Sequence, residues 1–230
     1  IRSKLEAKRL LTCCKGLPDD AKILDVGCGD GFHLNLLKQF GNKSWTLEGI
    51  DLDKRAIEMA AKSGLKVHQG SVESINLPHN YYDLAFMIMT IEHVEKPGEV
   101  LKGVLRLLKP GGKILIITDN TDALDFKLSK KKYWGGYHFP RHWNLFNKKS
   151  ITKLAKKNGF EVEVCGTQVS PVNWVYSIHN WLVAKKAPQW MINRFTLKST
   201  VSLSAFTILD IVLQKVYRGA LLRVILKKPL

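Results

Sequence analysis

The sequence of 230 residues contains few cysteines, and their arrangement excludes the usual cysteine-based scaffolds. The four cysteines include the adjacent pair Cys13 and Cys14, and none belongs to a Cys-x-x-Cys motif. Such spacing makes a poor framework for disulfides or for a zinc site. We therefore expect a reducing, cytoplasmic setting.

Long apolar runs are also absent from the sequence. No stretch reaches the roughly eighteen uninterrupted apolar residues that a membrane-spanning helix needs. Residues 1–16 are too basic for a secretory signal peptide, and they contain no apolar core. The sequence begins at Ile1 rather than Met, so we allow for residues that precede it. With 45% hydrophobic and 24% charged residues, the composition is typical of a globular domain.

Acidic residues are scarce in the last quarter of the chain. Residues 172–230 hold nine Lys and Arg against a single acid, Asp210, and so carry half of the net charge of +16. This density predicts an anionic partner, which would be a nucleic acid, an anionic membrane surface or a phosphorylated substrate. A solvated basic face is the alternative.

Strand-like and helix-like segments alternate along most of the chain. Apolar strand patterns occupy residues 22–26, 45–50, 65–68, 82–89, 113–118, 160–164 and 221–226. Helical patterns occupy 1–16, 32–40, 54–62, 99–108 and 150–158, and two more apolar helical stretches lie between 171 and 219. This alternation predicts an α/β, Rossmann-like, doubly wound, mostly parallel seven-stranded sheet with helices on both faces. The last helical stretches form an insertion before the final strand.

A glycine-rich loop follows the first predicted strand. Gly27, Gly29 and Gly31 stand between a buried strand and a helix, where the backbone can approach a ligand closely and helix N–H groups point at an anion. The spacing is not the G-x-G-x-x-G of dinucleotide-binding proteins, and an acid, Asp25, precedes the first glycine by two residues.

Four ordered motifs give the sequence a family resemblance. The segment Ile23-Leu24-Asp25-Val26-Gly27-Cys28-Gly29-Asp30-Gly31 resembles motif I of class I S-adenosylmethionine-dependent methyltransferases. Three further segments are similar to later motifs of that family. They are Glu48-Gly49-Ile50-Asp51, Tyr82-Asp83-Leu84 with Ile91-Glu92-His93-Val94, and Leu107-Leu108-Lys109-Pro110-Gly111-Gly112. The resemblance covers about residues 20–170. It points to the type 11/type 23 subgroup, which includes quinone-biosynthesis O-methyltransferases.

The resemblance implies a division of the chain and a set of cofactor contacts. Residues 1–18 would be a basic N-terminal helix, 19–170 the core that binds S-adenosylmethionine, 171–219 a helical insertion or cap, and 220–230 the last strand and tail. S-adenosyl-L-homocysteine would be the product. The residues expected to bind the cofactor are Asp25, Gly27, Cys28, Gly29, Gly31, Asp51, Leu52, Ser71, Val72, Met87 and Met89.

Four of these positions carry alternatives. Asp51 ends the predicted second strand, where a carboxylate can accept both ribose hydroxyls, but it could also cap the helix at 54–62. Ser71 stands where the family often has an acid for the adenine amine, so adenine recognition could pass to its hydroxyl, to the backbone of Val72 or to Glu73. Met87 and Met89 could equally be core residues, with Met89 the better placed to face a ligand.

The catalytic and substrate residues are expected after the fourth strand and in an aromatic loop. His93 and His142 are the catalytic candidates, since imidazole suits proton removal near neutral pH; alternatively, Glu92 and His93 cap the next helix. In the loop 133–146, which resembles the Pro-Arg-His segment of the subgroup, Tyr137, His138 and Arg141 are expected to bind substrate. The loop could instead pack over the sheet edge. Pro140 lies between His138 and His142 and no third ligand is evident nearby, so we expect no metal.

The sequence therefore predicts an enzyme that methylates oxygen or nitrogen of a small-molecule acceptor, possibly lipophilic or anionic. Aromatic and apolar residues beside Lys and Arg in 171–219 suggest peripheral membrane contact; a helical subdomain or a dimer interface is the alternative. An RNA or tRNA methyltransferase and a catalytically silent cofactor-binding partner protein remain open. The nucleic-acid reading is disfavoured because the sequence has neither an Asn/Asp-Pro-Pro-aromatic motif nor a Pro-Cys nucleophile. The oligomeric state is not predicted.

Overall fold

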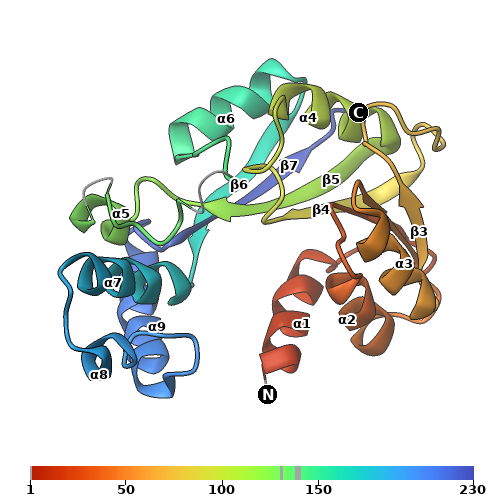
Figure 1. The fold of residues 1–230 in the computed structure, drawn as a ribbon. Helices are drawn as coiled ribbons and strands as arrows, with labels where there is room; N and C mark the ends of the chain where they lie inside the picture. Colours follow the sequence, from red (N-terminus) through yellow and green to blue (C-terminus); the bar gives the residue numbers. More distant parts are fainter. Residues whose placement is uncertain (1, 130–131, 138–140) are drawn as a thin grey trace.

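A computed structural model describes residues 2–129, 132–137 and 141–230 of the chain. Seven strands form one sheet in the order β3-β2-β1-β4-β5-β7-β6 (Figure 1). The strands are β1 (Lys22–Val26), β2 (Thr46–Asp51), β3 (Lys66–Gln69), β4 (Tyr82–Ile88), β5 (Leu108–Asp119), β6 (Glu161–Gln168) and β7 (Leu221–Lys227). The pairs among β1 to β5 are parallel, so the predicted fold class is confirmed.

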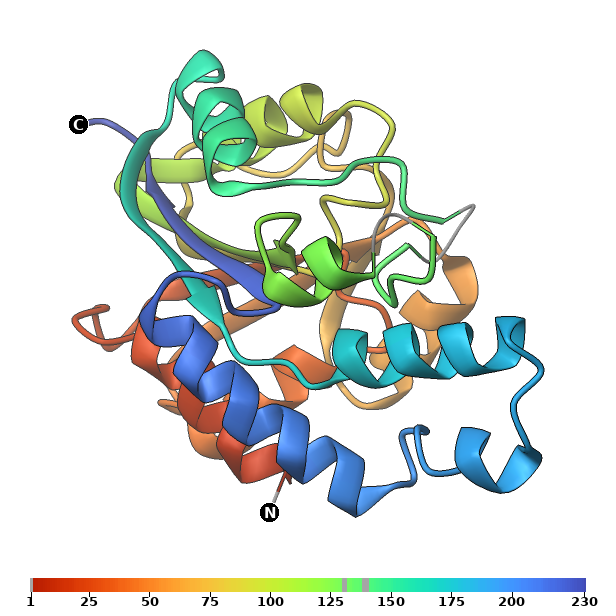
Figure 2. The same cartoon turned by 90° about the vertical axis from the view of Figure 1, so that its left-hand side faces the viewer.

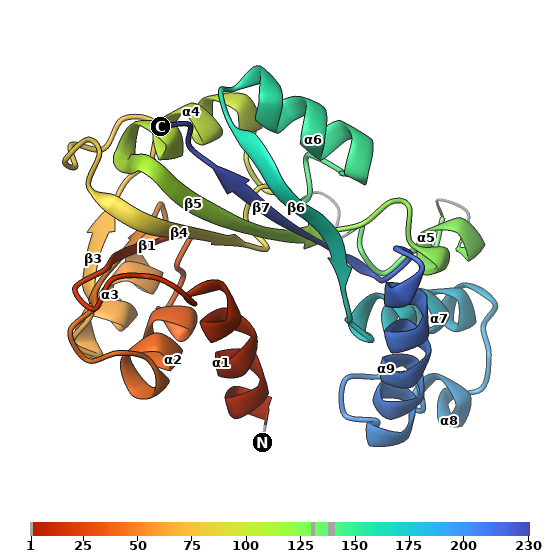
Figure 3. The ribbon, with the colours of Figure 1, turned by 180° about the vertical axis from the view of Figure 1, so that it is seen from behind.

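Helices cover both faces of the sheet, as Figures 1 and 3 show. On one side are α1 (Arg2–Cys13), α2 (Phe32–Phe40) and α3 (Lys54–Lys62), and on the other are α4 (Pro97–Leu107) and α6 (Lys148–Lys157). Each helix buries one apolar stripe against the strands, for example Val100, Leu101 and Val104 of α4. The central strand β4 is buried on both faces, which explains its unbroken apolar sequence.

The last strand lies inside the sheet and runs against its neighbours. β7 is inserted between β5 and β6 and is antiparallel to both, with Leu115 opposite Ile225 and Cys165 opposite Val224. The sequence predicts that a final strand completes the sheet, but its apolar pattern carries no information on which neighbours it joins.

The fifth strand begins earlier than its apolar pattern at 113–118 indicates. β5 starts at Leu108, and its pairing with β4 shifts register between Tyr82 and Leu84. The segment that follows β5 contains the short helix α5 (Leu124–Leu128). Proline and glycine at 110–112 weaken the local strand pattern, whereas the pairing with β4 extends the strand.

A buried acid fixes the edge of the sheet on the cofactor side. Glu48 of β2 accepts hydrogen bonds from Lys66, His68 and the Tyr82 hydroxyl, at 2.9, 2.8 and 3.2 Å. Burial alone would raise the pKa of Glu48, but these hydrogen bonds outweigh it and lower the pKa. The network joins β2, β3 and β4 beneath the pocket described below.

Residues 171–219 form a helical unit at the far end of the sheet. It contains α7 (Val172–Ala184), α8 (Gln189–Ile192) and α9 (Thr200–Lys215), and it extends away from the sheet next to α5 (Figures 1 and 2). Asp210 of α9 joins it to the sheet, accepting hydrogen bonds from the backbone N–H groups of Ser170 and Ala220. Within the described residues, every helix is too short or too polar to cross a membrane.

Candidate functional site

A pocket of about 480 Å³ opens at the carboxyl ends of β1, β2 and β4. This is the edge at which parallel α/β sheets bind ligands, because the strand order reverses between β1 and β4. The pocket is lined by Val26, Gly27, Ile50, Asp51, Leu52, Gly70, Ser71, Val72, Glu73, Met89, Thr90, His93, Val94, Glu95, Lys96 and Val100.

The glycine loop has the backbone shape that a close ligand requires. Gly27, Gly29 and Gly31 all have positive φ, of 77°, 55° and 81°, which other residues rarely adopt. A side chain on Gly27 would collide with Thr90, and one on Gly31 would collide with Leu65. A side chain on Gly29 would instead point into open space, so this glycine leaves room for a bound molecule.

Asp51 lies at the tip of β2 with its carboxylate turned toward the glycine loop. Its Oδ2 accepts the Gly29 N–H at 2.8 Å, and its Oδ1 accepts the Asp53 N–H at 2.8 Å. The cap of α3 is Asp53, which accepts from the N–H groups of Arg55 and Ala56. The alternative that Asp51 caps this helix is therefore wrong. Each carboxylate oxygen retains a second lone pair, which can accept a ribose hydroxyl.

Asp25 is a buried carboxylate without a hydrogen-bond donor among the described residues. It is 1% exposed, neither oxygen has a hydrogen-bond partner, and Nδ1 of His33 lies 3.7 Å from Oδ2. Unpaired buried carboxylates are costly, so this position fits an amino group brought by a ligand. Together with the space above Gly29 and the acceptor at Asp51, it fits the amino acid and ribose ends of S-adenosylmethionine.

Five residues predicted to bind the cofactor are absent from the pocket wall, namely Asp25, Cys28, Gly29, Gly31 and Met87. Two of them have side chains that pack elsewhere. The Cys28 thiol packs against Leu34 under β2, and burial raises its pKa to about 12, so Cys28 can contribute only its backbone. Met87 is fully buried in the core and is absent from the pocket wall, so its predicted role as cleft lining is corrected to a packing role.

Leu52, Ser71, Val72 and Met89 do line the pocket, as expected. Met89 is 37% exposed and has a φ of 53°, an unusual conformation for a residue with a side chain. Strain of this kind gathers at functional sites. Glu73 is also in the wall, so both of the side-chain alternatives for adenine recognition stay available.

An acid and two histidines meet beside the pocket. His93 follows β4 on a turn and lines the pocket, and its ring contacts the ring of His142 edge to face with centroids 4.5 Å apart. Each residue of the group Glu92, His93 and His142 offers one ligand atom, and these atoms lie within 4.8 Å of one another. The helix α4 begins later, at Pro97 with Lys96 as its cap, so Glu92 and His93 are not its cap.

Buried acids lie behind the two histidines. Glu92 is 0% exposed and accepts a hydrogen bond from the Thr118 hydroxyl at 2.8 Å, and burial raises its pKa to about 7. Asp119, at the end of β5, lies with Oδ2 3.4 Å from Nδ1 of His142, and Oδ1 accepts from Asn173 of α7 at 2.6 Å. Burial raises the pKa of Asp119 to about 6.

The aromatic loop is attached to the turn that carries Glu92 and His93. The N–H groups of Trp143 and Asn144 both donate to the carbonyl of Glu92, and Nδ1 of His93 is 3.0 Å from the carbonyl of Arg141. These bonds place Arg141 and His142 at the pocket rather than at a distant sheet edge. Arg141 is exposed, as an anion-binding residue requires.

The aromatic residues of the loop divide between packing and exposure. Trp134 is buried, and its Nε1–H donates to Asp125 at 2.8 Å, so it has a packing role. Tyr137 is half-buried and meets Trp134 edge to face at 5.3 Å. His138, predicted to bind substrate, lies outside the described residues. The sequence predicts no metal because His138 and His142 lack a third ligand nearby. In the structure, the residues that lie close to His142 are Glu92 and His93.

Sequence reasoning missed several residues of this site. Thr90 packs against Gly27 in the pocket wall, and Asp119 and Asn173 support His142 from elements distant in the sequence. Polar residues at the carboxyl ends of the central strands could have indicated some of these site residues, because those ends meet at one edge of the sheet. Nothing in the sequence pairs Asn173 with Asp119.

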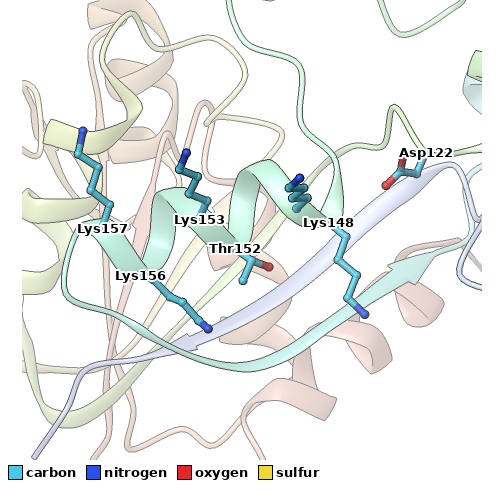
Figure 4. A pocket seen from close by; sticks show the side chains of 7 residues that line it. Asp122, Lys148, Thr152, Lys153, Lys156 and Lys157 are labelled. Carbon is cyan, nitrogen blue, oxygen red and sulfur yellow. The ribbon is translucent and has the colours of Figure 1, made fainter.

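A second hollow, of about 770 Å³, follows the lysine-rich helix α6. It is lined by Asp122, Lys148, Lys149, Thr152, Lys153, Lys156 and Lys157. Figure 4 shows Lys153 and Lys157 on one side of the helix and Lys148 and Lys156 on the other. Because these ammonium groups diverge, they form a solvated basic face rather than a site for one anion.

Comparisons of the sequence with known proteins agree with the geometry. The profile of a family described as a methyltransferase domain matches residues 2–164, which is more than half of the chain. A ubiquinone biosynthesis O-methyltransferase of Thiobacillus denitrificans is 28% identical over 185 residues, covering 72% of this chain and 78% of that protein. An uncharacterised methyltransferase of Bacillus subtilis is 31% identical over 125 residues, covering 52% and 67%.

Solved structures share the fold at lower identity. The (4+2)-cyclase SpnF has a TM-score of 0.66 at 18% identity, covering 99% of this chain and 81% of that one. Phosphoethanolamine N-methyltransferase 2 of Haemonchus contortus, solved with S-adenosylhomocysteine, has a TM-score of 0.64 at 19% identity, covering 98% and 52%. These likenesses establish the fold alone. On the family match and the ordered motifs, the chain belongs to the methyltransferase domain family, as a class I S-adenosylmethionine-dependent methyltransferase of the type 11/23 group.

Proposed function

We propose that this enzyme transfers a methyl group to an oxygen or nitrogen atom of a small-molecule acceptor. The observation that carries the proposal is the convergence of Glu92, His93 and His142 beside the cofactor pocket. Side chains that can take up a proton can remove it from the O–H or N–H group of an acceptor during methyl transfer.

The cofactor supplies a methyl group on a positively charged sulfur. Asp51 and the glycine loop would hold its ribose and amino acid ends, with Asp25 facing the amino group. Leu52 and Val72 would border the adenine, next to the polar groups of Ser71 and Glu73. Holding donor and acceptor in line is the main contribution that such an enzyme makes to the rate.

His93 is the residue that we assign to proton removal. The acceptor O–H or N–H bond breaks as its proton passes to the imidazole, and the acceptor atom forms a bond to the methyl carbon. The bond between methyl and sulfur breaks with its electron pair on sulfur, giving S-adenosylhomocysteine. His142 lies against His93 and is supported by Asp119, so it is placed to orient the base or to share its proton.

The loop residues suggest the kind of acceptor. Tyr137 offers a partly exposed ring, and the exposed Arg141 offers a cation. This pair suits an aromatic or otherwise flat acceptor that carries a negative charge. The name of the relative from Thiobacillus denitrificans, a ubiquinone biosynthesis O-methyltransferase, supports a phenolic oxygen as the first class to try. A nucleic-acid acceptor is disfavoured, because the sequence has neither an Asn/Asp-Pro-Pro-aromatic motif nor a Pro-Cys nucleophile.

We further propose a cytoplasmic enzyme whose helical unit at 171–219 rests on an anionic membrane surface and receives a lipophilic acceptor there. Exposed apolar residues on α9 and the basic residues Lys215 and Arg218 support this assignment. Asn173 connects the same unit to Asp119, so a bound acceptor could reach the catalytic cluster from the helical side.

The test is methyl transfer from isotopically labelled S-adenosylmethionine to a panel of phenolic, amine and carbohydrate acceptors. We expect turnover on a phenolic or amine compound, with S-adenosylhomocysteine formed in equal amount. His93→Ala should lower kcat by about 100-fold or more while S-adenosylhomocysteine still binds with unchanged Kd. The control is His79→Ala, which changes an exposed histidine that contacts Arg106 and is not part of the pocket wall. Equal kcat in the two variants would remove His93 from the chemistry, and turnover on tRNA alone would overturn the small-molecule proposal.

A further inference from the structure

Three potential ligand atoms come together from two distant parts of the chain. Glu92 and His93 are on the turn after β4, and His142 comes from the aromatic loop, 49 residues beyond His93. Their atoms lie within 4.8 Å of one another. Bonds of about 2.0–2.2 Å from one cation would set such atoms about 3–4 Å apart. Small side-chain movements are therefore enough for all three to reach one ion.

Both imidazole rings are held with the same nitrogen toward the backbone. Nδ1 of His93 lies 3.0 Å from the Arg141 carbonyl, and Nδ1 of His142 lies 2.8 Å from the Gly136 carbonyl. A carbonyl oxygen can only accept, so Nδ1 carries the hydrogen in each neutral ring. The lone pair then belongs to Nε2, the nitrogen that a cation would take. Histidines that bind metals have this arrangement, with one nitrogen on the metal and the other donating to an oxygen.

Glu92 adds a buried carboxyl group with one oxygen that lacks a hydrogen-bond partner among the described residues. It is completely buried, its Oε2 accepts the Thr118 hydroxyl, and its Oε1 has no hydrogen-bond partner among the described residues. A buried carboxylate without a partner is costly, and a bound cation removes that cost. This orphaned oxygen is evidence for a ligand that is independent of the two histidines.

A second layer of bonds holds the group in place. The carbonyl of Glu92 accepts the N–H groups of Trp143 and Asn144, which ties the loop to the turn. Asp119, itself bonded to Asn173, has Oδ2 at 3.4 Å from Nδ1 of His142. A carboxylate behind a histidine raises the basicity of the ring and fixes its orientation, as in many metal sites.

We infer that Glu92, His93 and His142 form a binding site for one divalent transition-metal cation. Two imidazoles and one carboxylate suit Zn²⁺, Fe²⁺ or Mn²⁺, whereas Mg²⁺ and Ca²⁺ prefer ligand sets made of oxygen. Three protein ligands leave coordination positions open, and His93 lines the cofactor pocket, so the open side is available to an acceptor.

The inference deepens the proposed function and rests on it for its catalytic meaning. A cation at this position would bind the acceptor oxygen and lower the pKa of its hydroxyl group, whose proton would leave to solvent. The two histidines would then act as ligands, and the cation would replace His93 as the group that makes the oxygen nucleophilic. This favours acceptors with a hydroxyl group over amines.

The test measures metal binding directly, without any acceptor. The 230-residue protein is treated with EDTA, dialysed, and titrated with ZnCl₂ by calorimetry and with CoCl₂ by visible absorption. We expect one ion per chain, a cobalt spectrum of nitrogen and oxygen ligands without thiolate bands, and no displacement by a hundredfold excess of MgCl₂. Glu92→Gln and His142→Gln should each weaken Zn²⁺ binding at least tenfold, while His79→Gln should leave it unchanged.

Several results would overturn the inference. Equal Zn²⁺ affinity in wild type, Glu92→Gln and His142→Gln, with all three folded by thermal melting, would mean that the ion binds elsewhere. Absence of Zn²⁺ binding to the wild type would mean that the three residues form no metal site. Methyl transfer that is unaffected by EDTA would remove the metal but keep the proposed function. One bound Zn²⁺ ion without turnover on any acceptor would keep the site and remove the proposed function.

Discussion

At the scale of single residues, two aspartates two positions apart serve different purposes. Asp51 faces the glycine loop and lines the pocket, whereas Asp53 caps α3 through two backbone N–H groups. Both are acids in the same stretch of sequence, and only their contacts distinguish them. This pair allows cofactor binding to be separated from helix stability.

Asp51→Ala should weaken the binding of S-adenosylhomocysteine by roughly 1.5–3 kcal/mol, because a charge-assisted acceptor for the ribose is lost. Asp53→Ala, the matched control, should cost about 1 kcal/mol of stability through the lost cap and leave the affinity nearly unchanged. Calorimetric titration and urea unfolding of both variants measure the two quantities. If Asp51→Ala bound the cofactor product as tightly as Asp53→Ala does, Asp51 would have no place in the site.

At the scale of elements, α5 and the aromatic loop are joined by a buried acid. Asp125 of α5 is completely buried and accepts the Nε1–H of Trp134. Burial raises the pKa of Asp125 to about 7, helped by the charges of Asp119 and Asp210 and opposed by the hydrogen bonds from Trp134 and the Phe126 backbone. The loop that reaches the catalytic cluster therefore rests on a titrating group.

The sign of the resulting pH dependence follows from the direction of this shift. The pKa of Asp125 is higher in the folded than in the unfolded chain, so the folded state binds more protons between about pH 4 and 7. The contribution to stability is complete below that window and is lost as pH rises through it. As pH rises from 5 to 8, the free energy of unfolding of Asp125→Asn should therefore increase by on the order of 2 kcal/mol relative to that of wild type.

Thermal melting of both proteins at pH 5 and at pH 8 measures this gain. For a chain of this length, the difference between the Tm of the variant and the Tm of wild type should grow by about 4–8 °C from pH 5 to pH 8. The control is Asp122→Asn, which changes a half-buried acid close by. An Asp125→Asn variant whose Tm changed with pH just as that of wild type and Asp122→Asn would show that Asp125 keeps an ordinary pKa in the folded state.

The elements differ in how well the sequence predicts them. Strands β1 to β5 and the glycine loop follow from local patterns, and Asp51 follows because it lies at the end of one of these strands. His93 and His142 are predicted one by one as catalytic candidates, but their meeting with Glu92 in one group could not be predicted, since it depends on how a long loop folds back. Met87 and Met89 differ by two positions and would share a face in a regular strand, but the positive φ of Met89 breaks that alternation.

At the scale of the whole molecule, the helical unit leaves an apolar stripe exposed. Ile208, Val212 and Val216 recur every fourth residue along α9 and are 66%, 58% and 60% exposed, so they share one helix face. Lys215 and Arg218 lie near the same end of the helix. Figures 1 and 3 show the unit extending away from the sheet.

An apolar stripe beside basic residues predicts binding to anionic membranes. Wild-type protein should sediment with vesicles that contain phosphatidylglycerol and much less with vesicles of phosphatidylcholine alone, and added salt should weaken the binding because the basic residues are screened. Val212→Asp should lower the bound fraction several-fold, because it places a negative charge in the stripe. Met59→Asp makes the same kind of change on α3, where the side chain is 56% exposed, and should have no effect. Wild-type protein that stays in the supernatant would remove the membrane from the proposal. Equal losses in both variants would mean that net charge, rather than the α9 stripe, controls the binding.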